Sequence, residues 1–327
     1  MNKEEIAKGI LSGSIKHLSK AITLIESNRP EDIDDSGIIL NRLISHTGHS
    51  LRIGISGPPG VGKSTFIDNF GLLIISKGLK VAVLSIDPSS QISKGSILGD
   101  KTRMSTLSVE KNAFIRPSPS GETLGGVASK TRESILLCEA AGYNVIIVET
   151  IGVGQSETAV CSMVDVFVLL QIPNSGDELQ GIKKGVLEVA DIIVVNKADG
   201  ENKKAAELSK AQLENAIHML RPIHNNWNPP VLLCSAIENK GIKDIWETIC
   251  NYKKIMLETS EFMYNRRNQN VSWMWDIILD NLKNMFKNSR AIKNVLPATE
   301  KKVFENKLHS RAAAEDLIAI FKNGMNS

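Results

Sequence analysis

The 327-residue sequence lacks the features expected of a membrane protein or a general nucleic acid-binding protein. Its longest apolar runs, such as Val81–Ile86, have the length of a strand and fall far short of the roughly 20 residues that a spanning helix needs. The net charge is only +3, and no stripe of lysine and arginine alternates with the aromatic residues, which make up 5% of the chain. We therefore expect no membrane segment and no nucleic acid partner.

Cysteine pairs and targeting signals are also missing. The 4 cysteines are widely spaced, without a C-x-x-C pair, and so predict no disulfide framework. The amino terminus carries acidic residues at once, and it has neither an apolar signal core nor an arginine- and serine-rich transit pattern. We expect a cytoplasmic protein.

What the sequence does contain is an alternation of helical patterns, short apolar runs and glycine-rich turns. Residues 3–27 carry apolar side chains at helical spacing, Ile15 among them, until Pro30 interrupts the pattern, and a second helix is expected over residues 34–46. From Leu51 onward, short apolar runs alternate with glycine-rich turns and helical stretches, which is typical of buried parallel strands. The expected strands are Leu51–Ser56, Val81–Ile86, Ala113–Arg116, Val145–Glu149, Val164–Gln171, Asp191–Asn196 and Val231–Ser235.

Strand patterns stop after about Asn251, and the remaining sequence is helical in character. This order predicts an α/β fold with a doubly wound, mostly parallel sheet in a P-loop NTPase domain over residues 51–252. An N-terminal helical segment (1–50) precedes this domain, and a C-terminal helical extension (253–327) follows it. Trp273 and Trp275 in the extension fit the core of a dimer better than a cofactor site.

One segment matches the phosphate-binding pattern G-x-x-x-x-G-K-[ST] directly after a strand and before a helix. It reads Gly57, Pro58, Pro59, Gly60, Val61, Gly62, Lys63, Ser64 and Thr65. Glycine is needed because backbone N–H groups must turn inward around a phosphate, where a β-carbon would obstruct them. Lys63 is then placed to neutralise the β- and γ-phosphates, and the Ser64 hydroxyl to bind Mg²⁺.

A second motif indicates which base is bound. Asn196, Lys197 and Asp199 form N-K-x-D after an expected strand, and the Asp199 carboxylate can accept hydrogen bonds from two N–H groups of guanine. Adenine offers neither donor there, so it would leave a carboxylate unpaired. Ser235 and Ala236 follow the last expected strand, where GTPases place a loop whose backbone N–H reaches the guanine oxygen. GTP and GDP are therefore the expected ligands.

Three acidic residues are candidates for binding Mg²⁺ or positioning water. Glu149 ends an apolar strand pattern, Asp87 follows another, and Asp100 lies in a polar turn. Each of the two aspartates could equally be a turn or cap residue.

The motifs together resemble the MeaB/ArgK/MMAA-type GTPases of the SIMIBI class, which are G-protein chaperones of adenosylcobalamin-dependent acyl-CoA mutases. Beyond Gly57–Thr65, the matching stretches are Ser85–Ser90, Gly95–Met104, Phe114–Ser120, Leu124–Ala128, Glu149–Glu157 and Asn196–Asp199. The resemblance covers nearly the whole chain. One departure is Glu122, where the family pattern has a smaller or uncharged residue.

The resemblance implies that Lys63, Ser64, Asp87, Asp100 and Glu149 surround the triphosphate and Mg²⁺, with the Asp100 loop as a switch. It also implies a homodimer formed through the C-terminal extension, and a stretch near Gln171–Lys184 that signals to a methylmalonyl-CoA mutase-like partner. GTP hydrolysis would then time the docking that gates cofactor loading or protects the loaded mutase.

Two alternatives to this interpretation stay open. One is a kinase or ATPase serving lysine, arginine and ornithine transport, and the other is a scaffold that binds GTP without hydrolysing it.

Overall fold

The computed structural model describes residues 2–86, 104–117, 124–150, 156–173, 184–219, 224 and 226–325. The chain divides into two compact units, Met1–Arg266 and Arg267–Ser327. The boundary between them falls within one long helix, α11 (Glu261–Asn288). Across the described ranges, no helix combines the length and the apolar character that crossing a membrane would require.

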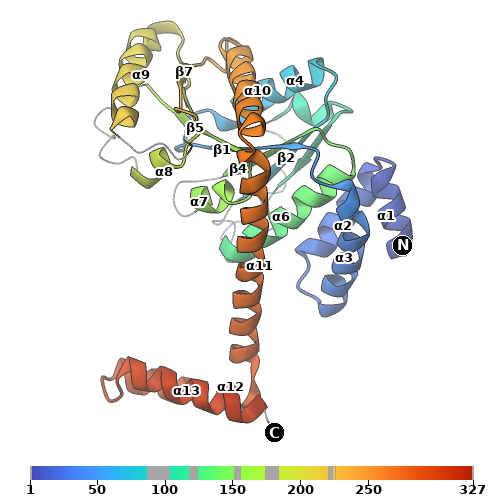
Figure 1. The fold of residues 1–327 in the computed structure, drawn as a ribbon, viewed down its shortest axis with the longest axis vertical. Helices are drawn as coiled ribbons and strands as arrows, with labels where there is room; N and C mark the ends of the chain where they lie inside the picture. The colour runs from blue at the N-terminus through green and yellow to red at the C-terminus, as the bar shows by residue number, and fades with distance from the viewer. Residues whose placement is uncertain are drawn as a thin grey trace. The chain divides into compact units, whose positions relative to one another are not determined.

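The first unit is built around a parallel β-sheet (Figure 1). Within the described residues it has 7 strands in the order β3-β2-β4-β1-β5-β6-β7, and each neighbouring pair is parallel. The strands are β1 (Leu51–Ser56), β2 (Val81–Ile86), β3 (Ala113–Arg116), β4 (Val145–Thr150), β5 (Val166–Gln171), β6 (Ile192–Val195) and β7 (Val231–Leu233). The predicted α/β class and the seven predicted strands are confirmed, with small differences at the ends of the last four strands.

Helices cover both faces of this sheet, as a doubly wound fold requires. Alternate residues of each strand enter opposite cores: in β2, Val81 and Val83 face one and Ala82 and Leu84 face the other. The first core is closed by α4 (Lys63–Ser76) and α10 (Ile242–Glu258). The second is closed by α6 (Leu124–Ala140), α7 (Ser156–Cys161), α8 (Lys184–Glu188) and α9 (Lys203–His218).

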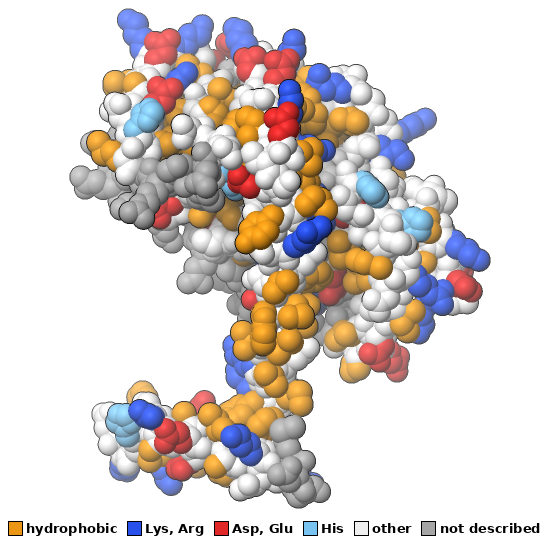
Figure 2. All heavy atoms as spheres, in the orientation of Figure 1, with side chains coloured by type: hydrophobic (Ala, Val, Ile, Leu, Met, Phe, Trp, Pro, Cys, Tyr) orange, Lys and Arg blue, Asp and Glu red, His pale blue; other side chains and the backbone are white. Residues whose placement is uncertain are grey.

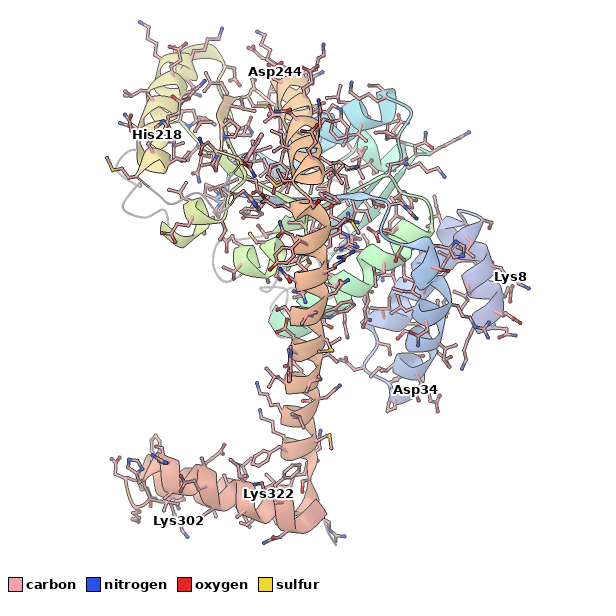
Figure 3. All side chains as sticks on the ribbon, in the orientation of Figure 1. Lys8, Asp34, His218, Asp244, Lys302 and Lys322 are labelled. Atoms are coloured by element: carbon pink, nitrogen blue, oxygen red, sulfur yellow. The ribbon has the colours of Figure 1, made fainter. Side chains whose placement is uncertain are left out.

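The amino-terminal residues form three α-helices and a short 3-10 turn that share the second core. They are α1 (Lys3–Leu11), α2 (Ile15–Glu26), α3 (Pro30–Leu43) and η1 (Ile44–His46). Their buried stripes pack against each other and against α6, while charged side chains such as Lys8 and Asp34 point outward (Figure 3).

The prediction of one helical pattern over residues 3–27 is wrong in one respect. Gly13 adopts φ +76 and separates α1 from α2, so the phase of the helix resets there. Ile15, expected on the apolar face, is consequently 46% exposed, whereas Ile10 and Leu18 are buried. Pro30 begins α3 because its fixed φ suits the first turn of a helix.

The second unit is entirely helical in its described part. After the remainder of α11 come α12 (Arg290–Phe304) and α13 (Ser310–Met325), which pack on each other. Phe286 and Phe321 meet edge to face with ring centroids 5.2 Å apart. The predicted helical character of the C-terminal region is confirmed.

Candidate functional site

A cavity of about 650 Å³ lies at the carboxyl edge of the sheet. Since all described strands are parallel, the end of β4 and the loops that follow β1, β6 and β7 meet there, as expected for ligand sites in open α/β sheets. The cavity is lined by Pro59, Gly60, Gly62, Lys63, Ser64, Thr65, Glu149, Asn196, Lys197, Asp199, Ala236 and Ile237. The structure therefore brings the two predicted motifs, which are more than a hundred residues apart in sequence, into one cavity.

One end of the cavity is the glycine-rich turn, which only glycine can complete at two positions. A β-carbon on Gly57 would lie 2.5 Å from the Leu170 carbonyl oxygen, and one on Gly62 would lie 2.9 Å from Asn196 Nδ2. Gly62 also has φ +90, a conformation that residues with a side chain rarely adopt. Between them, Val61 donates its backbone N–H to the Pro58 carbonyl at 3.3 Å and closes the loop.

Lys63 is the first residue of α4, so it lies where the positive end of the helix meets the cavity. Its ammonium group donates to the carbonyl oxygens of Gly57 at 2.7 Å and Pro58 at 3.2 Å. Burial lowers the pKa of Lys63, although the charges of Glu149 and Glu157 oppose that shift. A cation held at such a cost of desolvation is suited to a phosphate, which would compensate its charge.

Oxygen donors for a hard cation stand beside this lysine. Glu149 lies near the end of β4, is 3% exposed, and is held in register between Ile55 of β1 and Ser85 of β2. Ser64, at the second position of α4, lines the same cavity. A hydroxyl and a carboxylate are ligands that Mg²⁺ accepts, so these two residues could hold the ion. Asp87 and Asp100 lie outside the described residues.

Asn196 joins the loops at the other end of the cavity. Its side-chain amide donates to the Val61 carbonyl at 2.8 Å, and its side-chain oxygen accepts from the Ala236 N–H at 3.1 Å. The phosphate loop, the N-K-x-D segment and the Ser235–Ala236 loop are thereby joined through one buried side chain. In this arrangement the Ala236 N–H, one of the backbone donors of the loop that we predicted to reach guanine, is hydrogen-bonded to Asn196.

The two other members of the motif, Lys197 and Asp199, line the same cavity. Lys197 has φ 60, a backbone conformation that is unusual for a residue with a side chain and is often found at functional sites. One oxygen of the Asp199 carboxylate accepts a 2.5 Å hydrogen bond from the Ser235 hydroxyl. This bond fixes the orientation of the carboxylate at the cavity wall.

Residues 18–291 match the sequence model of a family described as methylmalonyl Co-A mutase-associated GTPase MeaB. This chain belongs to the MeaB GTPase family. The family description and the names of its relatives are those of GTPases, so the chain is a GTPase.

Individual MeaB-family relatives and similar proteins cover nearly the whole chain. The chain is 49% identical over 312 residues to a putative GTPase from Caulobacter vibrioides, with 95% of both proteins covered. It is 42% identical over 330 residues to a mouse protein described as methylmalonic aciduria type A homolog, mitochondrial, covering 98% of this chain and 80% of the mouse protein. A crystal structure of a protein described as LAO/AO transport system kinase is similar with a TM-score of 0.79 and 38% identity, covering 98% of this chain and 99% of the other.

Three residues around this MeaB-family site were not predicted. Ile237 lines the cavity beside Ala236 and is 77% exposed. Glu157 acts on the charge of Lys63, and Asn69 of α4 donates to the Ala236 carbonyl at 2.7 Å. Ile237 could have been found as the apolar neighbour of the Ser235–Ala236 pair. Asn69 carries no sequence signal, because its partner lies 167 positions away.

Proposed function

We propose that the chain is a GTP-driven chaperone of an adenosylcobalamin-dependent mutase of the methylmalonyl-CoA mutase kind. In its GTP form it would dock on the mutase, where it gates cofactor loading or protects the loaded enzyme. The description of the family names this mutase, and the name of the mouse relative refers to methylmalonic aciduria. The structural observation that carries the proposal is the single cavity lined by both Lys63 and Asp199.

In this proposal the residues of the cavity divide the work on GTP. Asp199 binds the guanine N–H groups, while Lys63 and the backbone of the glycine-rich turn bind the β- and γ-phosphates. Ser64 and Glu149 would hold Mg²⁺, which when bound neutralises charge that develops on the phosphates. Asp87 and Asp100 remain candidates for further metal or water contacts.

We further propose that two copies of the chain associate through α11. Beyond Arg266 this helix carries a stripe of large apolar side chains at spacings of three and four residues, each more than a third exposed, which Figure 2 shows gathered along the helix. They are Val271, Met274, Trp275, Ile278, Leu282 and Met285. An exposed stripe of this size is typical of a protein interface, and a second copy offers a matching stripe.

Substitution within the stripe tests the proposed dimer. Trp275→Glu should yield monomers in sedimentation equilibrium at concentrations where the parent chain is a dimer, because the charge would be buried in an apolar contact. Asn281→Glu on the same helix is the matched control. A parent chain that sediments as a monomer would contradict the proposal.

Hydrolysis measured with and without the mutase tests the chaperone role. We expect slow phosphate release by the chain alone and faster release when a methylmalonyl-CoA mutase from the same organism is added. The mutase should also co-purify with the tagged chain in the presence of a non-hydrolysable GTP analogue, and less well with GDP. Equal hydrolysis rates with and without the mutase, together with no co-purification, would sink the proposal.

The name of the similar crystal structure keeps the transport-linked kinase as a second candidate. A kinase of that kind would use ATP and a protein acceptor, whereas the cavity presents the Asp199 carboxylate, which adenine cannot satisfy. Calorimetry with GTP and ATP separates the two functions. GTP binding much tighter than ATP binding favours the chaperone.

A further inference from the structure

Asn69 connects the helix that begins at the phosphates with the loop that faces the base. It lies in the second turn of α4, six residues after Lys63, which corresponds to roughly 9 Å along the helix axis. Its side-chain amide donates to the Ala236 carbonyl at 2.7 Å. Ala236 is 3% exposed and lines the nucleotide cavity.

The contact completes a clamp on one residue of the base loop. The Ala236 N–H is held by Asn196 at 3.1 Å and the Ala236 carbonyl by Asn69 at 2.7 Å. Two successive peptide groups are therefore fixed from two separate elements, the N-K-x-D segment and the phosphate helix. Residues 237–239, which follow at once, are exposed, and the Glu238 N–H donates to the Ser235 hydroxyl at 3.1 Å.

We propose that Asn69 is a positioning residue that sets the distance between the guanine-facing loop and the phosphate cradle. Because α4 is one continuous helix from Lys63 to Ser76, the bond from Asn69 links its amino terminus to the Ala236 carbonyl through a regular hydrogen-bonded backbone. The loop then presents its backbone donors to the keto edge of guanine only while Lys63 and Ser64 hold the phosphates. Asn69 would thus add to guanine selectivity and slow the release of nucleotide without contacting the base or the phosphates itself.

Substitution of Asn69 followed by titration with three ligands tests the proposal. The ligands are GDP, ADP and inorganic tripolyphosphate: all three carry linked phosphates, the first two differ in their base, and the third has no base. In Asn69→Ala we expect the affinity for GDP to fall about five- to tenfold, as for the loss of one hydrogen bond, and GDP release to speed up accordingly. The affinities for ADP and tripolyphosphate should stay within about twofold, because neither ligand uses the keto-facing donors.

A near-isosteric variant sharpens the result. Asn69→Asp places a carboxylate oxygen against the Ala236 carbonyl oxygen, so it should weaken GDP binding more than Asn69→Ala does. Ser76→Ala is the matched control, because Ser76 is exposed at the far end of the same helix and its hydroxyl donates to the Leu73 carbonyl of that helix at 2.7 Å.

The pattern across ligands decides between positioning and general damage. Equal losses for GDP, ADP and tripolyphosphate would show that the cradle itself had been disturbed and would overturn the proposal. Unchanged GDP affinity in both Asn69 variants would overturn it as well. Neither outcome bears on the mutase, so this test is independent of the chaperone function.

Discussion

The two edges of the central sheet use charge in opposite ways. At the carboxyl edge, Lys63 and Asp199 line a cavity of about 650 Å³. At the amino edge, Arg266 pairs with Asp165 at 2.6 Å, and Arg52 pairs with Glu139 at 2.9 Å, with little exposure of any of these side chains. The charged groups at the amino edge pair with each other inside the chain, whereas Lys63 and Asp199 at the carboxyl edge line the cavity where we propose that GTP binds. Substitutions should therefore cost folding at one edge and binding or catalysis at the other.

The amino edge is organised around the Arg266 guanidinium. It donates to both oxygens of Asp165 and to the backbone carbonyls of Gly48 and Ser50, which precede β1. Asp165 also accepts from the Arg52 N–H at 2.7 Å. One buried side chain thus joins the first turns of α11 to the start of β1 and the start of β5. Its guanidinium carbon also lies 4.7 Å from the centroid of the Phe262 ring.

The largest effect is expected at this point. Arg266→Ala leaves the Asp165 carboxylate buried without its cation, so the free energy of unfolding should fall by about 3–5 kcal/mol. Urea denaturation measures the loss. Arg267→Ala, the exposed neighbour, should stay within about 0.5 kcal/mol of the parent. A loss below about 1 kcal/mol in Arg266→Ala would break the comparison between the edges, because the network would then contribute little.

The opposite result is expected for Lys63 at the carboxyl edge. Lys63→Ala should slow GTP hydrolysis about 100- to 1,000-fold, since it removes a charge that stabilises the transition state. Burial lowers the pKa of Lys63, which means that folding opposes its charged form, so the melting temperature should be unchanged or higher. Phosphate release and thermal melting are the two measurements. Lys77→Ala at the exposed end of the same helix is the control.

Asp199→Asn should change base preference with little effect on stability. The asparagine oxygen can still accept from Ser235, so the loop keeps its anchor. Its N–H group would oppose the guanine donors, and we expect GTP affinity to fall roughly 10- to 100-fold while xanthosine triphosphate, which has a carbonyl at that position, binds better than before. Calorimetry with both nucleotides is the measurement, with the exposed Asp244→Asn as control. Preserved preference for GTP would place the base elsewhere.

Much of this architecture can be predicted from short stretches of the sequence. The strands are apolar runs of branched residues, and the phosphate turn needs glycine at fixed positions, so both could be predicted. Ile15 was misplaced because the helical spacing of apolar residues continues across Gly13, although the backbone does not continue as one helix. The contacts of Asn69 and Arg266 could not be predicted, because their partners lie 167 and 101 positions away and no periodic pattern links such residues.

The smallest effect is expected at a third ion pair of the amino edge, which can titrate. His224 Nε2 lies 3.2 Å from Asp191, which directly precedes β6, and its Nδ1 lies 3.0 Å from Glu261 at the start of α11. The Tyr252 hydroxyl is 3.1 Å from Nε2. The hydrogen bond to Asp191 and the charges of both carboxylates outweigh burial and raise the pKa of His224 above its usual value.

The raised pKa of His224 makes the free energy of unfolding depend on pH. Between the unfolded pKa of about 6.5 and the raised folded pKa, the native state binds a proton that the unfolded state lacks. The contribution of His224 to the free energy of unfolding is therefore fully present below this interval and is lost as pH rises through it. His224→Gln should flatten this part of the stability curve in urea denaturation, whereas His46→Gln, at an exposed histidine, should leave it intact. GTP hydrolysis by both variants should match the parent, because His224 is held at the edge opposite the cavity. A pH profile that is the same in His224→Gln and in the parent would mean that this pair contributes as a neutral hydrogen bond, and that all titratable effects of the fold arise elsewhere.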